Sequence, residues 1–306
     1  MDNVRINQIL EQGIQTADLL AEKYHYPSNI THLLYLIIPA FLVKYGPSNE
    51  KKIIHSFMNI PIIIDDKQDE VYQAYYMSIP FLNSCEYFTN KGIVLKNYKN
   101  ISLMQLLDNL VHEFNHAINS INNEVRVVDN SLYIRTGLTF IIYDKNTLKA
   151  IGKKDNSVLE EIINTKQTEM IIDIINSFNQ YNISSREVIN TLYAINSEIN
   201  NFYQSNAYLL QSLVCRTLME NKTFLSTLEN LRFIGEIDEI ENWFDSITGR
   251  KKSYLRLTQI LKKTLDLQIE ITKKQGIKFL KINKIKKLNN EAMEIVHLFD
   301  RNCNYR

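Results

Sequence analysis

The chain has 306 residues, of which 45% are hydrophobic and 23% charged, a balance that is ordinary for a soluble globular protein. Its formal net charge of +1 argues against a global field that would attract nucleic acid or a membrane surface. Cys85, Cys215 and Cys303 lie far apart, which argues against a disulfide framework and a cysteine-based zinc site. We therefore expect a protein with reduced thiols and a core large enough for one or two domains.

The N-terminal residues lack the basic and apolar regions of a signal peptide. The longest apolar run, LLYLIIPAFLV at 33–43, is about half the ~20 residues that a spanning helix needs, and Pro39 interrupts it. We predict a buried helix here, no membrane span and a cytoplasmic location.

Proline and glycine are distributed unevenly along the chain. All five prolines fall within the first 80 residues, and only three glycines follow residue 152. Because proline breaks helix interiors, this asymmetry predicts an α+β, mostly α protein. We expect a mixed part at 1–180, with a small sheet and active-site helices, and an all-helical part at 181–306 packed on it.

The elements follow from periodicity and turn residues. In the N-terminal part we expect helices at 4–24, 30–45 and 102–121 and strands at 60–65 and 91–97, with Ser102 or Asn100 capping the third helix. Residues 131–152 are typical of a β-hairpin. Further helices are expected at 157–178, 185–220, 222–232, 236–247, 250–275 and 277–300.

The helix expected at 102–121 contains His112-Glu113-Phe114-Asn115-His116, an HExxH motif. Its histidines are spaced i, i+4 and are therefore neighbours on one helix face. Two imidazoles in this arrangement can bind one zinc ion, with Glu113 beside them to activate a water molecule.

The rest of this helix supports such a site. An apolar stripe runs along one side: Leu106, Leu110, Phe114, Ala117 and Ile118. The histidines share the other side with polar residues: Gln105, Asp108, Asn109 and Asn119. We expect the stripe to pack in the core while the histidine face borders a cleft.

A catalytic zinc ion needs a third protein ligand. The next expected helix begins SVLEE at residue 157, where Ser157 and Glu160 form a capping box that gives Glu160 a structural role. Glu161 points elsewhere and is the first choice for the third ligand. Glu169, with Asp173 one turn beyond it, is the alternative, and a solvated acidic first turn would also explain one of these carboxylates.

The segment VHEFNHAI, followed about 45 residues later by NSVLEEIINTKQTE, resembles the gluzincin group of zinc metallopeptidases. In that group an HExxH helix supplies two ligands and the general base, and a glutamate on a following helix supplies the third ligand. The resemblance covers about residues 60–175 and implies a zincin-like core.

Carried over to this sequence, the resemblance implies His112, His116 and Glu161 as zinc ligands and Glu113 as the catalytic base. It also implies that the strand at 91–97 is the edge strand that lines the substrate cleft.

We therefore predict a zinc-dependent hydrolase, a metallopeptidase acting on peptide or protein substrates. Zinc would polarise the scissile carbonyl and lower the pKa of its bound water, and Glu113 would pass the proton to the leaving amine. By position, Tyr203, Tyr208 and Arg135 are candidates for stabilising the oxyanion, although each also has an ordinary structural interpretation.

Asp108 lies one turn before His112 and could accept a hydrogen bond from its ring. An exposed helix carboxylate is the interpretation that we favour.

Residues 250–288 contain 13 lysines and arginines against two acids, interleaved with leucine and isoleucine. This basic amphipathic stretch is compatible with an acidic partner, RNA or a membrane surface. It is also compatible with a solvated face that nearby acids neutralise, for which we note Glu229, Glu236, Asp238, Glu239 and Glu241. The alternative function is a catalytically inactive zincin-like or helical interaction protein that acts through these helices.

Overall fold

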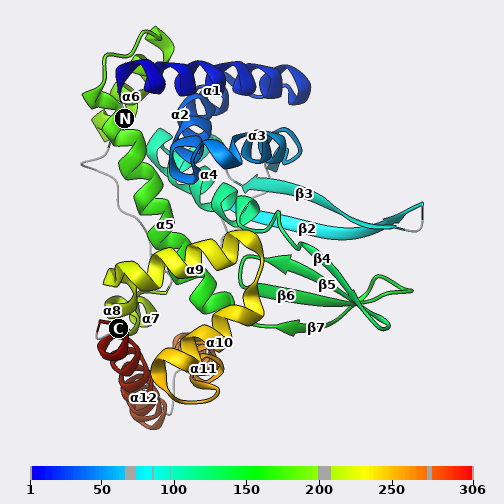
Figure 1. The fold of residues 1–306 in the computed structure, drawn as a ribbon, viewed down its shortest axis with the longest axis vertical. Helices are drawn as coiled ribbons and strands as arrows, with labels where there is room; N and C mark the ends of the chain where they lie inside the picture. The colour runs from blue at the N-terminus through cyan, green and yellow to red at the C-terminus, as the bar shows by residue number, and fades with distance from the viewer. Residues whose placement is uncertain are drawn as a thin grey trace. The chain divides into compact units, whose positions relative to one another are not determined.

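The computed structural model describes residues 2–65, 74–84, 86–96, 98–198, 208–273 and 278–304 (Figure 1). Over these ranges the protein is α+β and mostly helical, with two small sheets, as the sequence predicts. Residues 199–207 and 274–277, which fall within or beside helices expected at 185–220, 250–275 and 277–300, lie outside the described residues. Cys85 also lies outside them.

The chain divides into two compact units, each made of two separate segments. Unit 1 contains Met1–Ile118 and Gln167–Ser205, and unit 2 contains Asn119–Lys166 and Asn206–Arg306. This division differs from the one expected at residue 180. Helix α5 (Ser157–Ser177) contributes its first turns to unit 2 and the remainder to unit 1. Because this boundary between the units lies inside a helix, no change in composition marks it in the sequence.

The helices of unit 1 are α1 (Asn3–Tyr24), α2 (Ser28–Tyr45), α3 (Glu50–Met58), α4 (Leu103–Ile118), α6 (Arg186–Glu198) and the later turns of α5. Short 3-10 turns lie at Pro47–Asn49, Tyr98–Asn100 and Phe178–Gln180. The apolar run at 33–43 forms most of α2 and is almost entirely buried, which confirms the predicted buried helix. Pro39 lies inside α2 without ending it.

Helices α1 and α2 approach closely at a glycine. A Cβ atom at Gly13 would lie 2.3 Å from Cγ of Pro39, so the proline ring packs directly on the α1 backbone. Among the described helices, no single one is long and apolar enough to cross a membrane. The helical segments Ser28–Tyr45 and Pro47–Met58 meet that test only when they are counted together across a bend of 112°.

The sheet of unit 1 has the strand order β1-β3-β2. Strand β1 (Ile62–Asp65) is parallel to β3 (Glu86–Lys96), and β2 (Ala74–Asn83) is antiparallel to it. Beyond the end of β1, β2 and β3 continue as a two-stranded ribbon (Figure 1). The expected strand at 91–97 is therefore the central strand of this sheet, and the prediction that it forms an edge is wrong; Asn97 itself lies outside the described residues.

The edge strand beside α4 is β2, which the sequence analysis did not predict. Pro80 lies within it, opposite Thr89 of β3. Proline cannot donate to a sheet and is tolerated on edge strands, so the residue that obscured this strand in the sequence is compatible with its position.

Unit 2 contains a four-stranded antiparallel sheet in the order β4-β5-β6-β7. Its strands are β4 (Val125–Val128), β5 (Ser131–Thr136), β6 (Thr139–Asp144) and β7 (Ala150–Lys154). The hairpin expected at 131–152 is confirmed as β5 and β6, which turn through Gly137 in the left-handed region at φ 56°. Strands β4 and β7 extend this hairpin on either side.

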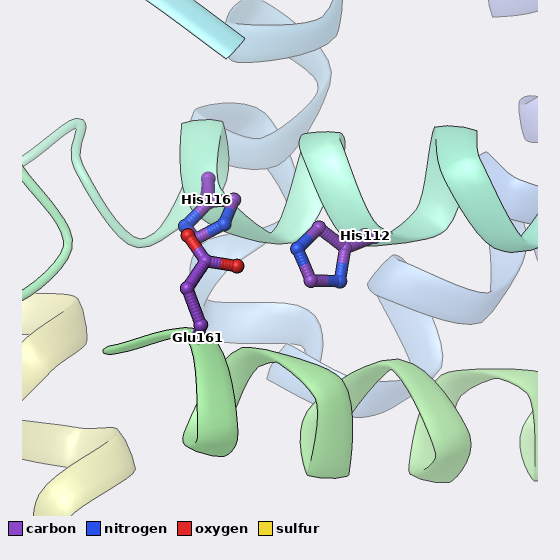
Figure 2. A group of neighbouring side chains, drawn as sticks. All are labelled: His112, His116 and Glu161. Atoms are coloured by element: carbon purple, nitrogen blue, oxygen red, sulfur yellow. The ribbon is translucent and has the colours of Figure 1, made fainter. Parts of the chain in front are cut away.

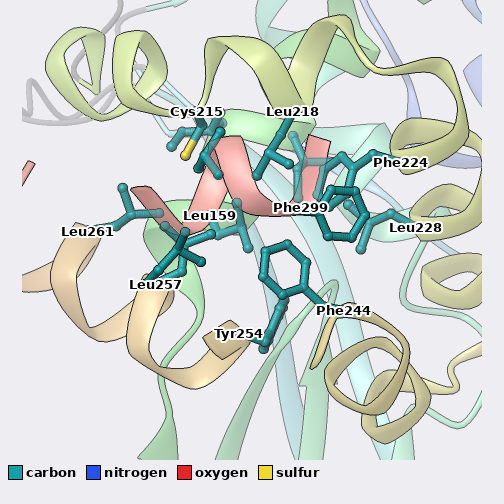
Figure 3. Packing of buried hydrophobic residues seen from close by; sticks show 14 of the residues in the cluster. Leu159, Cys215, Leu218, Phe224, Leu228, Phe244, Tyr254, Leu257, Leu261 and Phe299 are labelled. Atoms are coloured by element: carbon teal, nitrogen blue, oxygen red, sulfur yellow. The ribbon is translucent and has the colours of Figure 1, made fainter. Parts of the chain in front are cut away.

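The helices of unit 2 are the first turns of α5, α7 (Leu209–Val214), α8 (Arg216–Glu220), α9 (Lys222–Ile234), α10 (Ile237–Thr248), α11 (Ser253–Lys273) and α12 (Lys278–Asn304). Their apolar faces enclose an aromatic core, in which the rings of Phe244 and Phe299 stack at 4.6 Å (Figure 3). Leu159 of α5 is buried in the same core. The first turn of α5 is therefore anchored in unit 2 by its apolar side.

Candidate metal centre

Helix α4 carries the HExxH motif and is fixed at its N-terminus by two side chains. Ser102 Oγ accepts a hydrogen bond from Gln105 N–H at 3.2 Å, as expected for a cap. Glu198 of α6 accepts one from Met104 N–H at 2.8 Å, which places a carboxylate at the positive end of the helix.

Helix α4 is buried more completely than its apolar stripe predicts. It packs against α2, α3, α6, β2 and β3 of unit 1. As a result, Asp108, Asn115 and His116 are buried together with the stripe. His112 is only partly buried.

The two histidines of the motif lie side by side. Their ring centroids are 4.9 Å apart and the rings are inclined by 76°. Figure 2 shows both imidazoles on the side of α4 that faces α5, with the carboxylate of Glu161 reaching toward them. The i, i+4 spacing thus brings both rings to one helix face, as the sequence predicts.

Glu161 is placed by the first turn of α5. Asp155 caps this turn, because its Oδ1 accepts a hydrogen bond from Ser157 N–H at 3.1 Å. Burial opposes ionisation of Asp155, but the hydrogen bonds from Ser157 and the nearby Lys153 outweigh it and hold the pKa of this carboxyl below its ordinary value.

The predicted capping box is wrong, because Asp155 and not Glu160 accepts the N–H of Ser157, and the structural role of Glu160 depends on other partners. Its Oε2 accepts a hydrogen bond from Leu138 N–H at 2.9 Å, and its Oε1 pairs with the guanidinium of Arg232 on α9. Leu159 and Glu161 are two residues apart and so point in directions about 200° apart around the helix. Since Leu159 lies in the core, Glu161 faces the opposite side and remains partly exposed.

His112, His116 and Glu161 form a group that could hold a metal ion. Each offers one ligand atom, and these atoms all lie within 4.8 Å of one another. Ligands of a tetrahedral zinc ion, with bonds of about 2.0–2.2 Å, lie about 3.4 Å apart, so small side-chain rotations would close the group around one ion. Two imidazole nitrogens and a carboxylate oxygen suit zinc as well as other first-row divalent metals.

Glu113 follows His112 directly but points to the sheet. It is 8% exposed, and its Oε2 accepts a hydrogen bond of 2.6 Å from the backbone N–H of Tyr76 on the edge strand β2. This bond orients the carboxylate of the residue that follows His112. The sequence placed Glu113 beside the histidines but gave no sign that a strand would orient it.

A polar contact also joins α4 to α5. The buried side chain of Asn115 donates to Oε1 of Gln167 at 3.0 Å. Asn115 lies inside the HExxH motif, and Gln167 lies six residues after Glu161 on the same helix. This pair is not predictable from the sequence, because a lone asparagine and a lone glutamine on two helices carry no signal that they meet.

The structure separates the two candidates for the third ligand. Glu161 belongs to the group of three, whereas Glu169 and Asp173 are exposed on α5 and are not members of it. Asp108 is buried, which contradicts the interpretation that it is an exposed helix carboxylate.

The candidates for stabilising an oxyanion differ in their burial and contacts. Arg135 is fully buried, and its guanidinium donates to the backbone carbonyls of Asn122, Gly137 and Arg232, so its role is structural. Tyr208 packs partly buried against the core of unit 2. Tyr203 lies outside the described residues.

The basic stretch at 250–288 is partly neutralised within unit 2. Arg256 forms a two-bond ion pair with Glu291, at 2.5 and 2.8 Å, and Lys281 pairs with Glu270 at 2.6 Å. Lys262 lies 3.4 Å from Asp266 and 3.8 Å from Asp155. Asp266 and Glu270 are the two acids within the stretch itself, whereas Glu291 and Asp155 are not among the nearby acids expected to neutralise it. Of those expected acids, Asp238 and Glu241 pair with Lys154 of β7.

Comparison of the chain with models of protein families, with curated proteins and with solved structures finds no match.

Proposed function

We propose that this protein is a zinc-dependent hydrolase, a gluzincin-like metallopeptidase with a zincin-like core. His112, His116 and Glu161 would hold the zinc ion, and Glu113 would act as the general base. The observation that carries the proposal is the convergence of these three donors within 4.8 Å, beside a carboxylate that a backbone N–H orients.

The donor set matches that of a catalytic zinc site, in which three protein ligands leave one position open for water or substrate. A bound zinc ion would supply Lewis acidity, which polarises the scissile carbonyl and acidifies a water molecule. Glu113 would accept the proton of that water and deliver it to the leaving amine. The hydrogen bond from Tyr76 N–H keeps this carboxylate in one orientation while the proton moves.

A peptide substrate is favoured over other amides by the sheet of unit 1. Strand β2 is an edge strand, and it provides the N–H that holds Glu113. An extended peptide can add to a strand edge through backbone hydrogen bonds, which would bring a scissile bond near the base.

The test combines metal content with one substitution. Protein purified without added metal is expected to contain about one zinc per chain and to cleave peptides from a mixed library. Glu113→Gln keeps an oxygen that can accept the Tyr76 N–H but cannot act as a base. This variant is expected to retain zinc and to lose a factor of about 10²–10⁴ in turnover. Glu169→Gln is the matched control on an exposed residue and should leave both unchanged.

The second candidate function is a helical interaction protein that acts through the basic stretch at 250–288. Its support is the excess of lysine and arginine there. Wild-type protein without zinc and without hydrolytic activity would contradict the proposed enzyme and favour this candidate. Near wild-type turnover in Glu113→Gln would contradict the assignment of the base alone.

A further inference from the structure

The first turn of α5 is held by a fully buried arginine from another helix. The guanidinium of Arg232, on α9, pairs with Glu160 Oε1 and also donates to Oδ1 of Asn164 at 3.2 Å. Glu160, Asn164 and Arg232 are all buried. Because Glu160 and Asn164 are one turn apart, this single side chain bridges two successive turns of α5, on either side of Glu161.

The other side of the Glu160 carboxylate rests on the turn between β5 and β6. Oε2 accepts the N–H of Leu138 at 2.9 Å. A Cβ atom at Gly137 would lie 2.0 Å from Oε1, so the carboxylate occupies space that a side chain would take. The turn is itself braced, because Ser120 Oγ accepts the N–H of Gly137 at 2.8 Å.

The guanidinium of Arg135 connects this turn to α9. It donates to the carbonyl of Gly137 at 2.8 Å and to the carbonyl of Arg232 at 3.1 Å. The backbone of the turn and the backbone that carries Arg232 are thus fixed to each other. Glu160 is hydrogen-bonded to the turn through Leu138 N–H and to α9 through the Arg232 side chain.

We infer that Arg232 is a positioning residue for the metal ligand Glu161, an inference that rests on the proposed function. By drawing Glu160 into the turn, Arg232 fixes the rotation of α5 about its own axis, and the neighbouring carboxylate is directed to the histidines. A side chain extends about 5–6 Å from the helix axis, so a rotation of about 20° would move its tip by about 2 Å. Metal–ligand distances tolerate about 0.2 Å, so a displacement of this size adds substantially to the distance that side-chain rotation must close.

Arg232→Met tests the inference, because it keeps much of the side-chain length and removes the guanidinium. We expect zinc affinity, measured by competition with a chromophoric chelator, to fall by about 10- to 100-fold. The visible absorption of the cobalt-substituted protein should change, because it reports the number and geometry of the ligands. Arg232→Lys restores a cation and a donor and is expected to recover most of the affinity.

A matched control separates positioning from general loss of stability. Gln211 of α7 is equally buried in unit 2, and its amide donates to Gln268 of α11 at 2.5 Å. Gln211→Met therefore breaks a buried polar contact that joins α7 to α11. It is expected to lower the Tm of the metal-free protein while leaving zinc affinity and the cobalt spectrum unchanged.

The outcomes are distinguishable. If the wild type binds zinc and Arg232→Met binds it equally well, or if Gln211→Met weakens binding to the same extent, the inference is wrong and the proposed function stands. If the wild type does not bind zinc, both fail. Should Arg232→Met not fold, Glu160→Gln, which keeps the side-chain length, is expected to weaken zinc binding at least 10-fold, and unchanged affinity there would overturn the inference.

Discussion

Replacing Glu161 by glutamine, with Glu169→Gln as its control, tests the choice of the third ligand. Both substitutions remove one carboxylate from α5 and keep the helix propensity nearly constant. Glu161 is one of three donors that lie within 4.8 Å of one another, whereas Glu169 lies about two turns further along and is exposed. Only the first change should therefore alter metal binding.

The expected size follows from linkage between metal binding and folding. At a free zinc concentration 1,000 times the dissociation constant, binding to the folded state alone stabilises a protein by about 4.1 kcal/mol. Removal of a ligand should weaken binding at least as much as removal of a residue that supports one, about 100-fold at the upper end. The same zinc concentration would then stabilise Glu161→Gln by only about 1.4 kcal/mol. For a chain of 306 residues, the lost 2.7 kcal/mol or so corresponds to about 4 °C of the zinc-induced rise in Tm.

The assay is calorimetry of both variants and the wild type, each with zinc and with a chelator. Glu169→Gln should show the full rise in Tm, and Glu161→Gln a rise smaller by about 4 °C. The reasoning is refuted if Glu161→Gln keeps the full rise. A reduced rise in Glu169→Gln alone would transfer the ligand role to that residue.

Two further predictions concern unit 2. Gly137→Ala should destabilise the protein by at least about 2 kcal/mol in chemical denaturation, because it combines a left-handed φ with overlap on Glu160. Gly152→Ala, whose Cβ would meet its nearest atom at an ordinary 3.5 Å, should cost less, and equal losses would contradict the argument. Burial raises the pKa of the Cys215 thiol to about 12. At pH 8 a thiol reagent should therefore label the partly exposed Cys303 and leave Cys215 unlabelled until the protein is denatured. Mass spectrometry that finds Cys215 labelled in the folded protein would contradict its burial.

Local chemistry made much of this fold predictable. The helix at 157–177 and the hairpin at 131–144 lie within about two residues of their expected starts, because periodicity and turn residues act over a few positions. The i, i+4 spacing of His112 and His116 likewise fixes their common face before any tertiary contact forms. These parts depend on backbone geometry alone.

Features that depend on tertiary contacts were not predictable. Strand β2 was missed because Pro80 is acceptable only at a sheet edge, and the sequence does not say which strand is the edge. The burial of Asp108 is not predictable from the sequence of α4 alone, because the helices that cover α4 are far away in sequence. The same limit hid the two-segment composition of the units, since the chain crosses between them within α5.

The adjacent carboxylates of Glu160 and Glu161 show why the sequence favours Glu161 as the candidate ligand for a reason that is incomplete. Neighbouring residues on a helix point about 100° apart, so two adjacent glutamates cannot share one environment. When the side chain of Glu160 is bound to a buried partner, the side chain of Glu161 must point in another direction. The sequence predicts that Glu160 pairs with Ser157 in a capping box. In the structure Glu160 instead pairs with Arg232 and accepts a hydrogen bond from the N–H of Leu138. A buried carboxylate requires a cation and hydrogen bonds to offset its desolvation, which a cap in contact with solvent does not demand. The proposal of Glu161 as the ligand depends on Glu160 having a different partner. The buried ion pair with Arg232 defines the direction of the Glu160 side chain more specifically than a helix cap would.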